Sequence, residues 1–213
     1  MTAILFFCFL LSGLSSLIYE VLWLRMLILI FGSTTFAIST VLTAFMGGLA
    51  LGSFAFGRWI DRSGDPVRVY AILETAIGVY ALLIPSIFSA LVPLYRWIWQ
   101  SFHLHFYAFS VMQFALVTAV LVVPTTFMGA TLPILASYAS RRGNRPGFSV
   151  ASLYAVNTAG GVLGAFCSGF FLLPSFGVRM TTFSAGVVNL LIGASVLILV
   201  RVTRGAAEPR VST

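Results

Sequence analysis

Long apolar stretches without a charged residue dominate this sequence. Three of them cover residues 97–140, 146–178 and 180–200, and residues 32–57 form a fourth. Hydrophobic residues make up 60% of the 213 residues and charged residues 8%, whereas about 25% of the residues in a soluble domain are charged. A soluble domain of this size keeps roughly 30% of its surface in water, which so apolar a composition cannot cover with polar groups. We therefore exclude a soluble enzyme and expect helices that span a membrane.

Polar residues divide the chain into six expected transmembrane helices, so the predicted fold class is an all-α integral membrane protein. The transmembrane domain is expected over residues 1–200, and a basic cytoplasmic tail over residues 201–213. Six crossings place both termini on the same side of the membrane. The expected helices cover about residues 3–31, 34–57, 69–92, 105–139, 149–173 and 179–200.

The arginines are distributed unequally between the two sides of this topology. All twelve basic residues are arginines, and cytoplasmic loops are enriched in arginine. Only Arg96 and Arg179 fall on the outer side, and Arg25 lies within the first helix. The distribution predicts cytoplasmic termini and disfavours nucleic-acid binding, which needs basic residues spread over a polar surface. The arginines on the cytoplasmic side are Arg58, Arg62, Arg68, Arg141, Arg142, Arg145, Arg201, Arg204 and Arg210.

Two of the expected helices contain glycines four residues apart, Gly48 with Gly52 and Gly160 with Gly164. This spacing lets two helix backbones approach closely in lipid. The two clusters lie in helices of opposite direction, which is the pattern of a 3+3 inverted repeat. Because glycine is common in membrane helices, two chance matches are the alternative. We expect these glycine faces to pack helices together and to form a dimer interface.

The loop between the second and third expected helices carries the motif G-x-x-x-D-R-x-G, formed by Gly57, Asp61, Arg62 and Gly64. It resembles the signature loop of major facilitator superfamily transporters, and the resemblance implies a half-facilitator bundle of six helices in which this loop contributes to gating. The alternative is an ordinary cluster of charges that orients the protein in the membrane. Full-length members of the superfamily have twelve helices, whereas this chain has six expected ones.

A second resemblance extends over nearly the whole chain and is carried by six strings that occur in order. The chain is similar in these strings to the membrane region of bacterial spermidine synthase-like membrane proteins. The resemblance implies a bacterial inner membrane and a soluble aminopropyltransferase domain after the helices. After Val200 only a short basic tail remains, without a dinucleotide-type glycine fingerprint, so this chain is not expected to be an enzyme. The strings are Tyr19–Arg25, Phe31–Thr34, Gly48–Ser53, Leu73–Glu74, Pro124–Pro133 and Leu153–Thr158.

Glu20 lies near the middle of the first expected helix, about 16 Å from its outer end. A charged side chain at that depth costs at least about 2.5–3.5 kcal/mol, so Glu20 is expected to face the bundle interior. We interpret it as a cation or proton site, with a buried structural ion pair or a protonated acid as the alternative. Arg25 is its partner by charge, although five residues along a helix place it on another face. Glu74 is expected to be a structural buried charge.

Tyr154 and Asn157 are expected on one face of the fifth helix, three residues apart. Together with Tyr19 and Glu20 they form the expected substrate-binding set. The alternative for Tyr154 and Asn157 is that they only tie helices together. The sequence shows neither a cluster of metal ligands nor a nucleophile beside a base, so we expect no metal, no cofactor and no catalytic residues.

Two functions of different classes follow from these observations. The first is a half-size, facilitator-like transporter that acts as a homodimer in membrane lipid, with a small cation bound near Glu20. A polyamine as that cation rests on the family resemblance alone. The second is a non-catalytic membrane module that anchors or regulates a separate soluble aminopropyltransferase.

Overall fold

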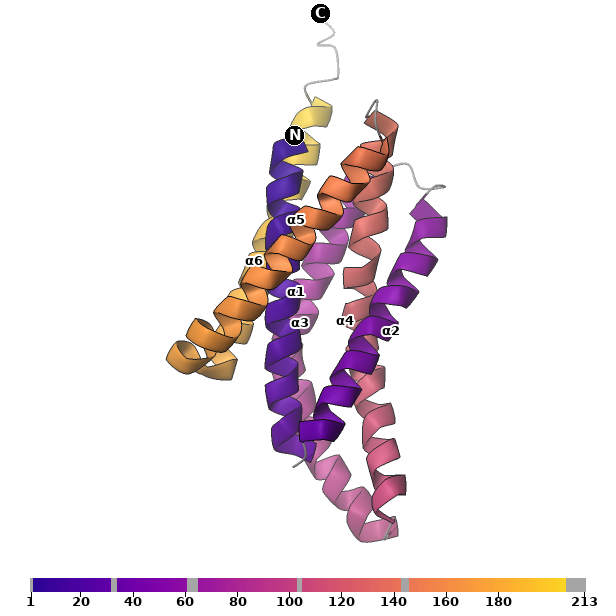
Figure 1. The fold of residues 1–213 in the computed structure, drawn as a ribbon, viewed down its shortest axis with the longest axis vertical. Helices are drawn as coiled ribbons and strands as arrows, with labels where there is room; N and C mark the ends of the chain where they lie inside the picture. Colours follow the sequence, from indigo (N-terminus) through magenta and orange to yellow (C-terminus); the bar gives the residue numbers. More distant parts are fainter. Residues whose placement is uncertain (1, 32–33, 61–64, 103–104, 143–145, 206–213) are drawn as a thin grey trace, which may run out of the picture.

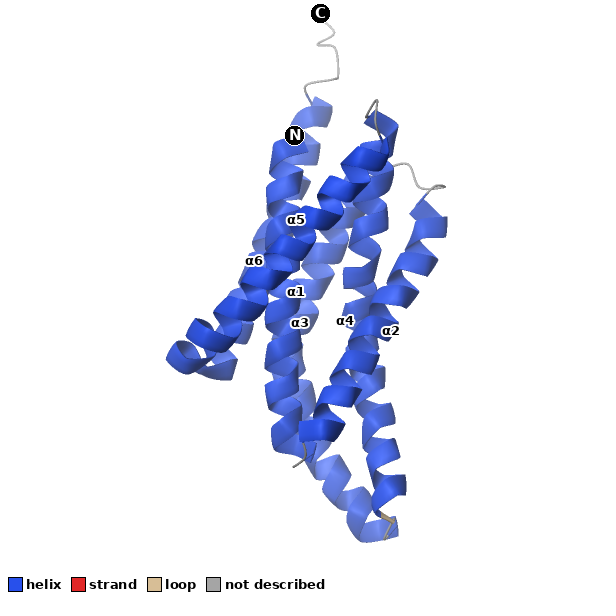
Figure 2. Ribbon diagram, in the orientation of Figure 1, coloured by secondary structure: helices blue, strands red, loops and turns tan. Residues whose placement is uncertain are grey.

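A computed structural model of the chain describes residues 2–31, 34–60, 65–102, 105–142 and 146–205, and all its elements are helical (Figure 2). The all-α fold class is therefore confirmed. The elements are α1 (Thr2–Phe31), α2 (Thr34–Ile60), α3 (Pro66–Phe102), α4 (Phe106–Arg142), α5 (Pro146–Cys167), the π-helical turn η1 (Ser168–Leu172) and α6 (Leu173–Gly205).

The prediction of six separate spans in a half-facilitator bundle with a 3+3 inverted repeat is wrong. Five helical segments in the described part of the chain are long and apolar enough to cross a membrane. The fifth, Val150–Thr203, is one segment of 54 residues where two helices were expected. Its parts α5, η1 and α6 follow one another without a loop, because the helical hydrogen bonding continues through Pro174, where a turn was expected.

The long last segment reverses direction at Gly177. A straight helix of that length would extend about 80 Å, far beyond the roughly 30 Å of a bilayer's apolar core. Gly177 has non-helical backbone angles, φ 69° and ψ 176°, in a region that essentially only glycine adopts. Figure 1 shows α5 running away from the chain's N-terminal end and α6 returning toward it. Both α5 and α6 contact α1.

Two other boundaries differ from the expected ones. α3 continues to Phe102 and includes Pro85 and Pro93, although the third expected helix ended at residue 92. Membrane helices tolerate proline, because neighbouring groups satisfy the backbone that proline frees. α6 continues to Gly205, so the helix passes the expected start of the tail at residue 201.

The first close helix pair is α2 with α4. A methyl group on Gly52 would collide with the backbone of Thr126 and Ala130, and one on Gly129 would collide with the backbone of Leu49. Gly48 lies equally close to Thr125. In this pair the glycines bring two helices of one chain into backbone contact.

Two further pairs follow the same principle. In α5, Gly160 lies against the backbone of Leu10, and Gly164 against that of Leu14, both in α1. In α3, Gly78 lies against the backbone of Gly186 in α6. The glycine faces of α2 and α5, which were expected at an interface between two copies, are occupied within one chain by α4 and α1.

The two ends of the bundle differ in composition. The start of α1 and the end of α6 lie at one end (Figure 1), which we call the arginine end, with the exposed residues Arg58, Arg68, Arg141 and Arg201. At the opposite end α3 passes to α4, and we call it the aromatic end. Its exposed aromatic residues are Trp97, Trp99, Phe102, Phe106 and Tyr107. Aromatic belts of this kind mark the boundary between membrane and water.

Candidate functional site

A carboxyl group lies in the interior of the bundle, on α3. Glu74 is 0% exposed and lies eight residues, or about 12 Å, along the helix from Pro66. It faces α1 and α6, which pack on the same side of α3. This is the most enclosed ionisable carboxyl group among the described residues.

Both oxygens of the Glu74 carboxyl group are hydrogen-bonded. The Ser12 hydroxyl of α1 donates to Oε1 over 2.6 Å, and Asn189 Nδ2 of α6 donates to Oε2 over 2.6 Å. The Tyr19 hydroxyl of α1 then donates to Asn189 Oδ1 over 2.8 Å. We call these four side chains the Glu74 network. All four are buried, and together they join α1, α3 and α6.

The hydrogen-bond partners of Glu74 are neutral. A serine hydroxyl can donate to a carboxylate or accept from a carboxylic acid, so the 2.6 Å contact with Ser12 suits either protonation state. A carboxylate here would have no cationic hydrogen-bond partner among the described residues, and an unpaired charge inside a membrane protein is costly. An uncharged acid therefore fits the network better.

Two aromatic side chains beside the network keep unpaired polar atoms. Tyr70 lies one helical turn before Glu74 and is 0% exposed, and its hydroxyl lies close to Glu74 and Ser12 without completing a hydrogen bond of good geometry. Trp23 stacks on Tyr19 with ring centroids 5.6 Å apart, and its indole nitrogen has no hydrogen-bond partner in the described ranges. The network is therefore bordered by aromatic side chains.

Glu20, the expected cation site, is half-buried and lies outside the Glu74 network. The neighbouring Tyr19 faces the network, and consecutive side chains on a helix point about 100° apart. No hydrogen bond or ion pair of Glu20 is found among the described residues. Arg25 is exposed and lines a cleft of about 640 Å³ beside Gly177.

The expected substrate-binding set is not brought together. Tyr19 belongs to the Glu74 network, whereas Asn157 Nδ2 donates to the backbone carbonyl of Phe9 over 3.1 Å and so ties α5 to α1. Tyr154 is 62% exposed. Of the alternatives for Asn157, the geometry favours the tie between helices.

The loop motif is only partly visible. Asp61, Arg62 and Gly64 lie outside the described residues, and Gly57 lies in α2 next to Pro133 of α4. Within the described ranges no group of three or more histidine, cysteine or acidic side chains could hold a metal ion.

Sequence reasoning missed Ser12 and Asn189. The available signal was that Asn189 is the single amide side chain in the apolar stretch of residues 180–200. Polar side chains in such stretches are expected to find partners on neighbouring helices.

With this geometry in place, the comparison with known proteins gives one relative. The chain is similar to polyamine aminopropyltransferase 1 of Streptomyces coelicolor. The two are 27% identical over 185 residues, which is 86% of this chain and 32% of the relative. The chain therefore spans about a third of that relative's length. No protein-family model and no solved structure matches the chain, so the likeness to half of a major facilitator transporter has no support from these comparisons.

Proposed function

We propose that this chain is a membrane module of polyamine metabolism that anchors or regulates an aminopropyltransferase lying outside these helices. The similarity to the Streptomyces coelicolor aminopropyltransferase carries the proposal. It covers most of this chain, but about two thirds of the relative has no counterpart in it. The five apolar helical segments support a place in the membrane.

The packing of the bundle supports a scaffold. Backbone contacts at glycine join α1 to α5, α2 to α4 and α3 to α6, and the Glu74 network joins α1, α3 and α6 by buried hydrogen bonds. We propose that the arginine end faces the cytoplasm of a bacterial inner membrane, in keeping with the enrichment of arginine on that side. An enzyme that docks on this end would meet Arg58, Arg68 and Arg201.

Purification of the tagged chain from native membranes in mild detergent tests this proposal. We expect the purified material to transfer aminopropyl groups to putrescine, because the enzyme stays attached. A variant with Arg58, Arg68 and Arg201 all changed to glutamine should lose most of this activity while keeping its own yield. Arg179→Gln is the control, since Arg179 is exposed on α6 close to the fold-back at Gly177. Purified chain without aminopropyl transfer would refute the proposal.

Transport of a small cation is the second candidate, and the half-buried Glu20 favours it. A second copy of the chain would complete the passage, and its contact would have to avoid the glycine faces that the chain uses itself. In proteoliposomes, this candidate predicts uptake of labelled putrescine or spermidine that falls to the level of empty vesicles in Glu20→Gln. Asp65→Asn, at the start of α3, is the matched change of a carboxylate to an amide. If the unaltered chain takes up neither compound, transport is excluded for both polyamines.

A further inference from the structure

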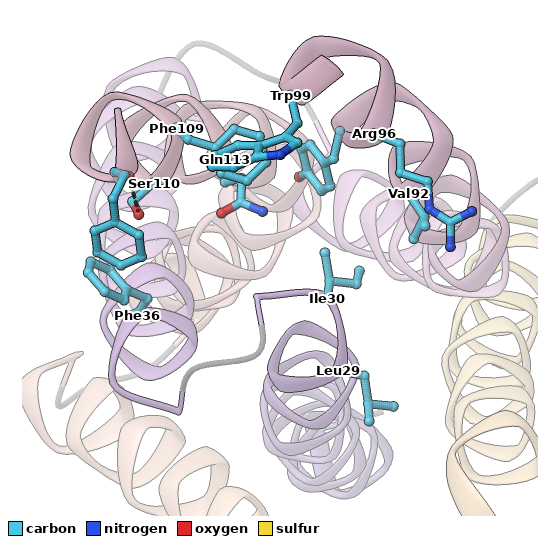
Figure 3. A pocket seen from close by; sticks show the side chains of 11 residues that line it. Leu29, Ile30, Phe36, Val92, Arg96, Trp99, Phe109, Ser110 and Gln113 are labelled. Atoms are coloured by element: carbon cyan, nitrogen blue, oxygen red, sulfur yellow. Dashed lines mark hydrogen bonds between the residues drawn. The ribbon is translucent and has the colours of Figure 1, made fainter. Parts of the chain in front are cut away.

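A pocket of about 440 Å³ lies at the aromatic end, between the ends of four helices (Figure 3). Leu29 and Ile30 of α1 form one side, Phe36 of α2 and the start of α4 form another, and the last turns of α3 close it. Its volume is within the range of pockets that hold small ligands. It is far along the bundle from the arginine end, where the proposed enzyme would dock.

Two polar side chains of this pocket lack partners although they are buried. Gln113 is 7% exposed, forms no hydrogen bond within the described residues, and directs its amide into the pocket in Figure 3. Tyr95 is 5% exposed, and its hydroxyl has no partner in the same ranges. The Tyr95 hydroxyl oxygen has almost no accessible surface, so the Gln113 amide is the group that a ligand in the cavity can reach. Buried polar groups are almost always hydrogen-bonded, so this unpaired amide indicates a bound polar molecule.

The other residues that line the pocket indicate the charge of the ligand. Trp99 and Phe109 meet edge to face with centroids 4.9 Å apart, and Phe36 and Phe106 do so at 5.7 Å. Among the described residues, the lining contains one charged side chain, Arg96, and no acidic one. An anionic group is therefore favoured and a cation such as a polyamine is disfavoured.

The position of the pocket identifies the source of such an anion. Leu29, on its edge, is 82% exposed, and an exposed leucine on a membrane helix faces lipid chains. Exposed tryptophans beside the pocket place it at the depth of lipid headgroups. We propose that the pocket binds the headgroup of an anionic phospholipid. The phosphate lies at Arg96, the polar headgroup bonds to the Gln113 amide, and the acyl chains run along Leu29.

Native mass spectrometry of the purified chain with equal amounts of phosphatidylglycerol and phosphatidylcholine tests the proposal. We expect phosphatidylglycerol to bind about tenfold more tightly, as one charge-assisted contact would give. Arg96→Gln should remove this preference, and Gln113→Leu should weaken binding of phosphatidylglycerol. Arg179→Gln and Gln100→Leu are the matched controls, because both residues are exposed and neither lines the pocket. They should leave lipid binding unchanged.

Three results would overturn the proposal. Equal binding of the two lipids by the unaltered chain would exclude an anionic site. A preference that survives Arg96→Gln but is lost in Arg179→Gln would place the anion elsewhere. Binding of free glycerol phosphate as tight as that of phosphatidylglycerol would show that the ligand is a soluble phosphate and not a lipid. Because Arg96 is exposed, Arg96→Gln should unfold at the same temperature as the unaltered chain. A change in lipid binding then reflects the loss of the guanidinium group.

Discussion

Replacing Gly48 by leucine will destabilise the bundle by about 3 kcal/mol or more, whereas the same change at Gly47 will not. A Cβ atom on Gly48 would overlap the side chain of Thr125, while a Cβ atom on Gly47 meets no atom within 4 Å. Inserting side-chain atoms into a packed interior typically costs about 1–3 kcal/mol, and more where the backbone must move. Both substitutions gain helix propensity equally, so their difference isolates the contact.

Unfolding of the two variants in detergent, followed by circular dichroism, measures this difference. If Gly48 instead mediated contact between two copies, Gly48→Leu would lower the mass of the assembly and leave the unfolding of the single chain unchanged. Equal stability of the Gly47 and Gly48 variants, without change in mass, would contradict the packing of α2 on α4.

Replacing Glu74 by alanine will cost about 2–4 kcal/mol, and replacing it by glutamine will cost less than about 1 kcal/mol. Alanine leaves a cavity in the packed interior. It also removes a hydrogen-bond partner from both Ser12 and Asn189, and leaving a buried polar group without a partner lowers stability by about 1–3 kcal/mol. Glutamine has the shape of the uncharged acid. Its amide can donate to Ser12, and its carbonyl oxygen can accept from Asn189.

The same unfolding measurement applies, with Glu20→Ala as the control for removing a carboxyl group from a membrane helix. Since Glu20 is half-buried and outside the network, its loss should change stability by less than about 1 kcal/mol. If Glu74→Gln is as unstable as Glu74→Ala, the network needs the negative charge, and the assignment of an uncharged acid is wrong.

The sequence largely predicts where the helices lie along the chain. It does not predict which side of each helix packs against protein. Long apolar stretches with few charges locate α1, α2 and α4 within a few residues, because the bilayer demands such stretches. A helix that is apolar on every side gives no sign of which side meets protein and which meets lipid. Residues 174–178 were expected to lie between two helices, whereas the helix continues on either side of the bend at Gly177.

For the same reason, the sequence did not show which carboxyl group is enclosed by the bundle. Glu20 and Glu74 both lie within apolar stretches, and depth alone made Glu20 the stronger candidate. The structure encloses Glu74 because its side chain meets polar groups on two other helices, which only the three-dimensional packing reveals. Glycine spacing likewise predicted close approach of helices, but spacing cannot tell a partner in the same chain from one in a second copy.

The three glycine-mediated pairs join α1 to α5, α2 to α4 and α3 to α6, and none of them joins consecutive helices. A ribosome delivers the helices to the membrane in order, from the N-terminus onward. A nascent chain that ends after α3 therefore holds one member of every pair and no completed pair. Backbone contact can begin only when α4 arrives, and the Glu74 network can close only when Asn189 emerges. Until then, α1 can contact α2 and α3, and lipid covers the faces that later helices will occupy.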